Sequence, residues 1–353
     1  MPTTEIAEPA VDAPSSTEGV APRPRRSVLE QGVATVAGLI AAAAILAILA
    51  GLLGRLFWVF ELASHFRFQY LIALAAAALL FAVVRRWRQA AFVALCTTAL
   101  ATTFWPLYRA PTTAPPAQAT VYRAMAINVL TGNRHFDEVK DLIRRESPDF
   151  VVLAEVTQTW ADELADLADE YPYAKIDSRP GAFGIALFSR VEPEQMELYR
   201  YGRGYRSAIV AQFILQGHPF SVVGTHPYPP RSRQAAEVRT QQLAEVANVV
   251  NRQEGDVLLL GDLNTTSWSP LFADLTNATG LHDSRNGFGR NPSWPSPLSP
   301  ALRIAIDHAL VSDGVCVHDR RVGPPIGSDH LPIVVDFSLS SGDASRPEQR
   351  GNQ

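Results

Sequence analysis

Polar side chains suited to metal and phosphate chemistry recur where apolar segments end in the second half of the chain. Asn128 follows RAMAI, Glu155 follows FVVLA and His226 follows SVVGT. The same arrangement continues with Asp262 and Asn264 after VLLLG, Asp307 and His308 after RIAI, and Asp329 and His330 in GSDHLP. Loops at strand ends are where a rigid sheet presents catalytic groups. A single carboxylate there is usually a helix cap or a turn residue, but turns alone do not explain the whole series.

These residue types indicate hydrolysis of a phosphate ester assisted by a hard cation. Glu155 is an oxygen ligand that suits Mg²⁺ or Mn²⁺ better than zinc, and the sequence has no Cys/His cluster. Asp262 and Asn264 lie two apart on an extended segment, so their side chains project to one face. One could accept a proton from water while the other donates a hydrogen bond to a phosphoryl oxygen. His330, oriented by Asp307, could donate to the same phosphate.

The short segments around these residues resemble the endonuclease/exonuclease/phosphatase superfamily. They are NV at 128–129, LAE at 153–155, TH at 225–226, GDLN at 261–264, IDH at 306–308 and SDH at 328–330. The similarity covers roughly residues 121–340, and GDLN together with a late SDH is specific. The resemblance implies a four-layer α/β sandwich, with two packed mixed sheets flanked by helices. It also implies divalent-metal-dependent cleavage of a phosphate ester.

The resemblance further implies a role for each matching residue. Glu155 is the metal carboxylate, with Asn128 beside it, and Asp329 assists the metal or the phosphate. The catalytic residues are Asp262, Asn264, His330, Asp307 and His226. Arg206 and Trp294 are expected to bind substrate. For Trp294 the alternative is a Pro-stiffened surface loop with the ring packed down.

Alternating strand and helix patterns surround these residues. Apolar runs predict strands at residues 121–129, 149–155, 183–189, 206–215, 219–225 and 256–262, with a strand-rich final part from IDHALV to PIVVDF. Amphipathic spacing predicts helices at residues 135–146, 157–169 and 232–252, and a short helix from about residue 269. This order is typical of sheets inside and helices outside.

The first third of the chain is predicted to be a membrane anchor of three transmembrane helices. Uncharged runs of 24, 17 and 20 residues cover residues 31–54, 68–84 and 89–108. A helix of 24 residues is roughly 36 Å long, enough to cross a hydrocarbon core of ~30 Å. A cleaved signal peptide is the alternative for the first run, but a signal core is usually about 7–15 residues long and two further runs follow.

Arginines predict the orientation of this anchor. Three lie within residues 23–26 and three within residues 85–88, against two in the first loop. Positive charge favours the cytoplasmic side, so three crossings would leave the catalytic domain extracytoplasmic, on the cell (inner or plasma) membrane. The remaining segments are expected to be a disordered cytoplasmic tail at 1–30, a Pro/Thr/Ala linker at 109–120 and a disordered tail at 341–353.

Charge bears on the substrate and the partners. Residues 121–340 carry 20 Lys and Arg against 27 Asp and Glu, a net charge of −7. Tight non-specific binding to DNA is driven by cations, so an acidic domain is poorly equipped for it. A nucleic acid, a phospholipid headgroup and a small phosphoester all stay open as substrates. The lipid bilayer is the other expected partner, and no obligate protein partner is evident.

A binding module and a transport protein are the two alternatives to an enzyme. A catalytically silent, membrane-tethered binding module could use the same scaffold, but every expected catalytic position is retained. A transport protein would need charged groups within its helices, and these runs have none. Two cysteines, Cys96 and Cys316, exclude a disulfide framework and a zinc knuckle.

Overall fold

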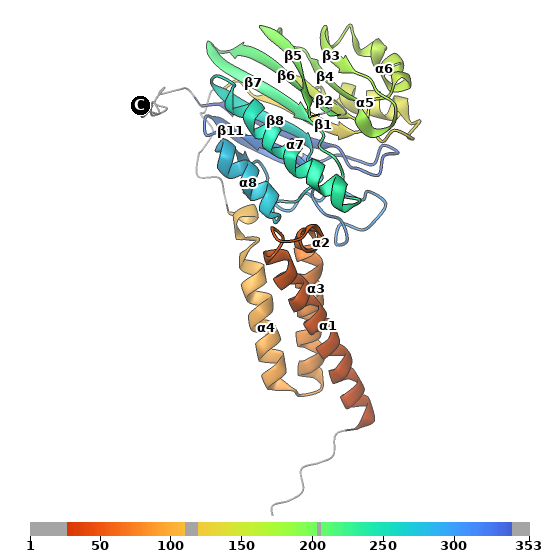
Figure 1. Ribbon diagram of the computed structural model, residues 1–353, viewed down its shortest axis with the longest axis vertical. Helices are drawn as coiled ribbons and strands as arrows, with labels where there is room; N and C mark the ends of the chain where they lie inside the picture. Colours follow the sequence, from red (N-terminus) through yellow and green to blue (C-terminus); the bar gives the residue numbers. More distant parts are fainter. Residues whose placement is uncertain (1–26, 110–118, 203–205, 341–353) are drawn as a thin grey trace, which may run out of the picture.

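The structure is a computed structural model that describes residues 27–109, 119–202 and 206–340. Residues 27–109 form a helical bundle, and the following residues form an α/β sandwich that stands on one end of this bundle (Figure 1). Most of the two expected tails and of the expected linker lies outside the described residues. The first helix, α1, begins at Val28 with Ser27 as its N-cap, so this helix starts slightly before the expected boundary.

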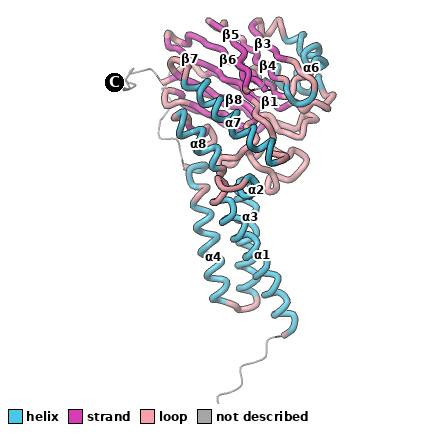
Figure 2. The backbone as a smooth tube through the Cα atoms, in the orientation of Figure 1, coloured by secondary structure: helices cyan, strands magenta, loops and turns pink. Residues whose placement is uncertain are grey.

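Two six-stranded mixed sheets form the centre of the sandwich (Figure 2). The strand orders are β11-β12-β1-β2-β4-β3 and β5-β6-β7-β8-β10-β9. The pairs β1–β2 and β7–β8 are parallel, and the other pairs are antiparallel. The strands are β1 Tyr122–Asn128, β2 Phe150–Ala154, β3 Tyr173–Asp177, β4 Ile185–Ser189, β5 Gln195–Tyr201, β6 Arg206–Leu215, β7 His218–Thr225, β8 Asp256–Asp262, β9 His282–Asp283, β10 Asp307–Val311, β11 Val315–Val322 and β12 Ile333–Leu339.

Helices cover the outer face of each sheet. The sandwich helices are α5 Phe136–Glu146, α6 Gln158–Glu163, α7 Arg233–Asn251 and α8 Pro270–Thr279, with short 3₁₀ turns η3 Leu164–Leu167 and η4 Gly181–Phe183. Apolar side chains of α5 and α6 pack on the first sheet, and those of α7 and α8 pack on the second. Between the sheets lie the rings of Phe150, Phe213, Phe220 and Phe337. The expected fold class, two packed mixed sheets flanked by helices, is confirmed.

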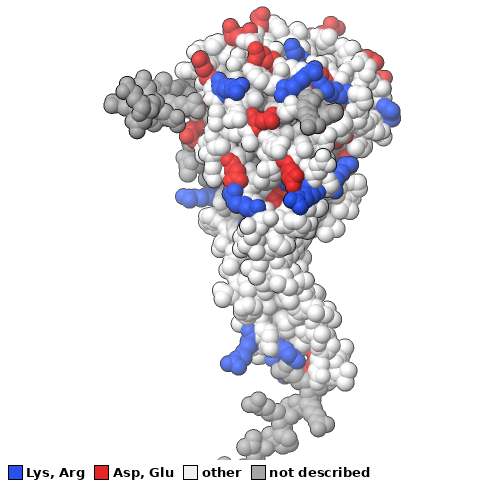
Figure 3. Space-filling model, in the orientation of Figure 1, with Lys and Arg blue, Asp and Glu red and all other residues white. Residues whose placement is uncertain are grey.

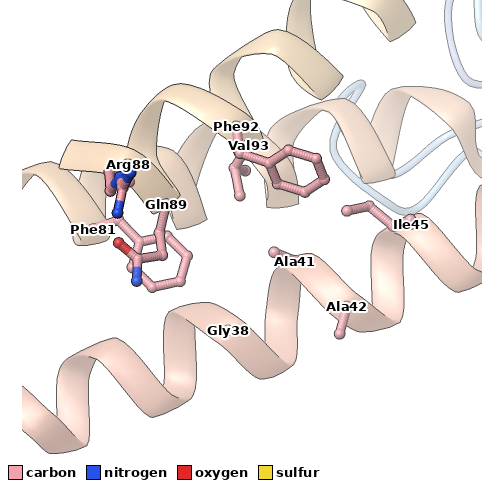
Figure 4. Close-up of a pocket in the computed structure, with 9 residues that line it drawn as sticks. All are labelled: Gly38, Ala41, Ala42, Ile45, Phe81, Arg88, Gln89, Phe92 and Val93. Atoms are coloured by element: carbon pink, nitrogen blue, oxygen red, sulfur yellow. The ribbon is translucent and has the colours of Figure 1, made fainter. Parts of the chain in front are cut away.

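The bundle consists of three long helices and a short helical cap. Its elements are α1 Val28–Leu52, α2 Trp58–Ala63, η1 Ser64–Phe66, α3 Arg67–Val83, α4 Trp87–Thr102 and η2 Trp105–Tyr108. Helix α3 packs against both α1 and α4. A groove of about 430 Å³ separates α1 from α4, and Phe92 of α4 and Ala41 and Ile45 of α1 line it (Figure 4). On the face of the bundle seen in Figure 3, charged side chains are almost absent until its far end.

Two stretches of the bundle, Val28–Leu52 and Trp58–Val83, are long and apolar enough to cross a membrane. The predicted third transmembrane helix is not among these stretches. Within the uncharged run 89–108, helix α4 ends at Thr102 and has only 16 residues. At 1.5 Å per residue it is about 24 Å long, shorter than the hydrocarbon core of ~30 Å.

The end of that third run belongs to the interface between the bundle and the sandwich. The carbonyls of Pro106 and Leu107 accept hydrogen bonds from the backbone N–H groups of Gly287 (3.1 Å) and Gly289 (2.7 Å). Just before them, the ring of Phe104 lies 4.7 Å from that of Trp268. Counting uncharged residues overestimated the length of the helix, because the residues that contact the sandwich after Thr102 are uncharged too.

Candidate active site

The site is assembled at one end of the two sheets. Strands β1, β2, β7 and β8 all end there. Strands β12 and β10 run antiparallel to β1 and β8, so they begin at the same end. The residues that this topology brings to the common edge are Asn128, Glu155, His226, Asp262, Asp307 and His330. Convergence therefore follows from strand direction within each sheet and from the packing of the two sheets against each other.

Gly261 allows the close approach of two of these strands. Its φ is +144°, and a Cβ atom at this position would lie 2.0 Å from the carbonyl oxygen of Thr225 at the end of β7. No side chain fits there. The glycine of the GDLN segment thus brings Asp262 beside His226, the residue that follows Thr225, with His226 Nε2 at 3.3 Å from Asp262 Oδ2.

Asp262, Asp307 and His330 form a buried cluster. Asp262 and Asp307 are directly opposite each other in the β8–β10 ladder. His330 Nδ1 lies 2.9 Å from Asp307 Oδ2, and His330 Nε2 lies 3.7 Å from Asp262 Oδ2. One ligand atom from each of the three residues lies within 4.8 Å of the others, close enough for a shared metal ion.

His330 is charged at neutral pH. Burial lowers its pKa, but the carboxylates of Asp307 and Asp262 outweigh burial and raise the pKa to about 10. The hydrogen bond to Asp307 fixes the ring through Nδ1. The imidazolium therefore presents its Nε2–H at the cleft.

Asp262 receives hydrogen bonds that keep it ionised. Burial opposes its charge, but His330 and His226 hold the pKa of Asp262 well below its ordinary range. Burial and the charge of Arg206 lower the pKa of His226. A neutral His226 can accept at Nδ1 from Arg206 Nη1 (2.5 Å) and donate from Nε2 to Asp262. The backbone N–H of Asn264 donates to Asp262 Oδ1 at 2.8 Å.

Glu155 and Asn128 form the oxygen-rich side of the site. Glu155 has a φ of +65°, and its carboxylate accepts from Thr131 N (3.0 Å) and Thr131 Oγ1 (3.1 Å). Asn128 Nδ2 lies 3.2 Å from Glu155 Oε1 and 3.1 Å from Asp262 Oδ2. Burial opposes the charge of Glu155, but His226 and these hydrogen bonds hold its pKa below its ordinary value. Two carboxylates thus lie on either side of the Asn128 amide N–H group, and carboxylate oxygens are ligands that Mg²⁺ and Mn²⁺ prefer.

A cleft of about 720 Å³ opens over these groups. Of the residues predicted from the sequence, those that line it are Glu155, Arg206, His226, Asp262, Asn264, Trp294, Asp329 and His330. Asn128 and Asp307 lie behind them, bonded to Glu155 and His330. Asp329 is engaged by Trp294, whose Nε1 donates to Asp329 Oδ2 at 3.1 Å. The Trp294 ring is half-buried, its centroid 6.4 Å from that of His330.

Several lining residues were missed in the sequence. The rings of Phe183 and Tyr228 lie 5.2 and 5.0 Å from the Arg206 guanidinium. Leu62, His65 and Phe66 come from the bundle, far from the sandwich in sequence. Two of these three are ordinary apolar residues, so nothing in the segment marked it as part of a site.

Comparison with known proteins agrees with this geometry. Residues 125–330 match the Endonuclease/Exonuclease/phosphatase family. The chain belongs to this family. Members of the endonuclease/exonuclease/phosphatase family hydrolyse phosphoester bonds and use divalent metals. No curated protein matches the chain.

Solved structures of this family share the fold at low sequence identity. An endonuclease/exonuclease/phosphatase from Beutenbergia cavernae DSM 12333 is 22% identical, with 63% of this chain and 72% of that chain covered and a TM-score of 0.50. D. rerio TDP2 complexed with single-strand DNA product is 16% identical (62% and 100% covered, TM-score 0.54). The human Nocturnin catalytic domain with bound sulfate is 18% identical (62% and 95% covered, TM-score 0.50).

Proposed function

We propose that this protein is a membrane-anchored, divalent-metal-dependent hydrolase of phosphate esters. The observation that carries the proposal is the convergence of Glu155, Asp262 and His330 in one cleft. A metal-ligating carboxylate, a proton acceptor and a charged hydrogen-bond donor are the groups that such a hydrolysis needs.

Glu155 and Asn128 would hold Mg²⁺ or Mn²⁺, with Asp329 assisting at the edge of the cleft. Such a cation, when bound, polarises the phosphoryl oxygen and offsets the negative charge that develops on it. The alternative group of Asp262, Asp307 and His330 is less suited, because Asp307 Oδ2 and His330 Nδ1 already bond each other at 2.9 Å. Mg²⁺ and Mn²⁺ prefer oxygen ligands, which favours the Glu155 side of the cleft as the place of the cation.

The side chains of the cleft carry out the other steps of the proposed hydrolysis. Asp262, ionised and held by His226 and Asn264, accepts a proton from the attacking water. His330 donates from Nε2 to a phosphoryl oxygen, while Asp307 keeps its ring oriented. Asn264 lines the cleft, where its amide would contact the same phosphate. Arg206 adds positive charge and orients His226.

The lining favours a phosphoester with an apolar portion, such as a phospholipid headgroup ester, over a long nucleic acid. Its cations are Arg206, Arg231 and the His330 imidazolium, whereas Leu62, Phe66 and Ile304 contribute apolar surface. A nucleic-acid backbone is bound by many cations in series. An amphipathic or small phosphoester needs one phosphate subsite and an apolar wall.

We also propose that the bundle anchors the protein in the cell membrane, with the sandwich extracytoplasmic. Supporting this are the two stretches long enough to cross a bilayer and the arginine-rich turn at residues 85–88, at the end of the bundle away from the sandwich. Helix α4 packs along α3 and leads from this turn back to the sandwich, so the chain returns to the side opposite the arginines. A topology reporter fused after Gln353 is expected to work on the extracytoplasmic side. A reporter active only in the cytoplasm would reverse the orientation.

The function is tested with the purified full chain in Mg²⁺ or Mn²⁺. We expect hydrolysis of bis-p-nitrophenyl phosphate and of a phospholipid, with slower cleavage of plasmid DNA. Asp262→Asn should lower kcat by at least about 100-fold without unfolding the protein, because the proton acceptor is lost and the shape is kept. Asp313→Asn, the same change at an exposed carboxylate, is the matched control. Unchanged turnover in Asp262→Asn would remove this residue from the mechanism.

A further inference from the structure

A buried ion pair links the bundle to the catalytic part of the sandwich. Glu61 of α2 is 2% exposed and Arg239 of α7 is 1% exposed. Arg239 Nη2 lies 2.5 Å from Glu61 Oε2. Burying two charges costs desolvation free energy that their attraction barely repays, so stability alone is a weak reason for such a pair. Its hydrogen bonds indicate what else it does.

Both members of the pair hold the loop that follows Asp262. Arg239 Nη1 donates to the backbone carbonyl of Asn264 at 2.5 Å. Glu61 Oε1 accepts from Ser269 Oγ at 2.5 Å, with Thr265 Oγ1 at 3.5 Å. The loop from Asn264 to Ser269 is therefore fixed at both ends by this one ion pair. Its first residue, Asn264, in turn orients the Asp262 carboxylate.

The residues next to Glu61 form one side of the cleft. Leu62, His65 and Phe66 line it together with the catalytic side chains. His65 Nδ1 also lies 3.0 Å from Thr266 Oγ1, which adds a contact to the same loop. The bundle thus contributes both a wall of the site and the contacts that support the loop from Asn264 to Ser269, called the catalytic loop below.

We infer that Glu61 is a positioning residue of the active site, acting through Arg239 on the loop from Asn264 to Ser269. This inference rests on the proposed hydrolase function. Without Glu61, the Arg239 guanidinium is left buried without a counter-charge, which favours its movement toward water and away from the Asn264 carbonyl. A shift of about 1 Å in a catalytic group can cost about 100-fold in rate.

The test uses the full chain, with bis-p-nitrophenyl phosphate and Mn²⁺ as probes. Glu61→Ala and Arg239→Ala are each expected to lower kcat by at least about 10-fold while KM changes less than about threefold. The loss of kcat in the double variant should not exceed that of the more impaired single variant, because both substitutions break the same linkage. Glu61→Gln, which keeps the shape and the acceptor for Ser269, gives a folded comparison should Glu61→Ala fail to fold.

Arg55→Ala is the matched control. Arg55 also joins the bundle to the sandwich, at 2.5 Å from Asp274 of α8, but it does not contact the catalytic loop. Its kcat should equal that of the wild type. The inference is overturned by Glu61 and Arg239 variants that keep kcat within twofold, by losses that add in the double variant, or by an equal loss in Arg55→Ala. A wild-type chain that hydrolyses no probe would instead contradict the proposed function.

Discussion

Replacing Asp307 with Asn should turn a nearly pH-independent enzyme into one that works only below neutral pH. The Asp307 carboxylate accepts from His330 Nδ1 at 2.9 Å, and both side chains are buried. Asn keeps the shape and can still accept this hydrogen bond. What the substitution removes is the charge that favours the imidazolium.

The size of the effect follows from the pKa of His330. Burial lowers it, and Asp307 is the largest opposing influence that raises it to about 10. Wild-type His330 is therefore protonated below that pH and loses its proton only as the pH rises through about 10. Without Asp307 the pKa should fall toward its ordinary value of about 6.5. At pH 8 about 3% of the imidazolium would then remain, so kcat should drop about 30-fold, against less than about twofold at pH 6.

The measurement is kcat of the full chain between pH 5.5 and 9 in saturating Mn²⁺. His330→Gln serves as the control, since it carries no charge at any pH and should show a loss that acid does not restore. Parallel pH profiles for Asp307→Asn and the wild type, displaced by a constant factor, would refute the role given to the Asp307 charge.

Two further perturbations test the architecture and the cation. Gly261→Ala should lower the free energy of unfolding in denaturant titrations by about 2 kcal/mol, because its Cβ would overlap the Thr225 carbonyl. Gly132→Ala, where no atom lies within 4 Å of the added Cβ, should change it much less. Removing divalent metal with a chelator should abolish hydrolysis, and Mg²⁺ or Mn²⁺ should restore it. Recovery with Zn²⁺ alone would contradict the oxygen-ligand site around Glu155.

Much of the sandwich could be predicted because buried strands and amphipathic helices leave strong patterns. Residues 256–262, predicted as a strand from DVLLLGD, form β8, and residues 206–215 form β6. Strands β3 and β5 were missed. β3 lies at a sheet edge with no buried residue, and β5 at an edge with one, so neither carries a strong apolar signal. The predicted helix at 157–169 is shorter and continues as a 3₁₀ turn.

The active site, too, could be predicted from the sequence only in part. Polar residues at strand ends could be identified because each follows an apolar strand, but Asn128 and Asp262 belong to different sheets and meet only through the packing of the two sheets. Glu61 and Arg239 could not be paired from the sequence, since they are 178 residues apart and their elements belong to different parts of the fold. The same is true of Phe104, which an uncharged run assigned to a membrane helix and which packs on Trp268 instead.

Because Asp262 and Asp307 are paired across two strands, the chemistry and the substrate preference of the protein depend on different residues. The distance between these carboxylates is set by the β8–β10 ladder, not by the chain that joins the two strands. Beyond the loop that ends at Ser269, residues 270–306 of the intervening segment carry Trp294, Ile304 and Ile306 of the cleft wall. Insertions or substitutions there can retune which molecule is accepted while the proton-handling pair keeps its spacing, so substrate preference is free to change without rebuilding the chemistry.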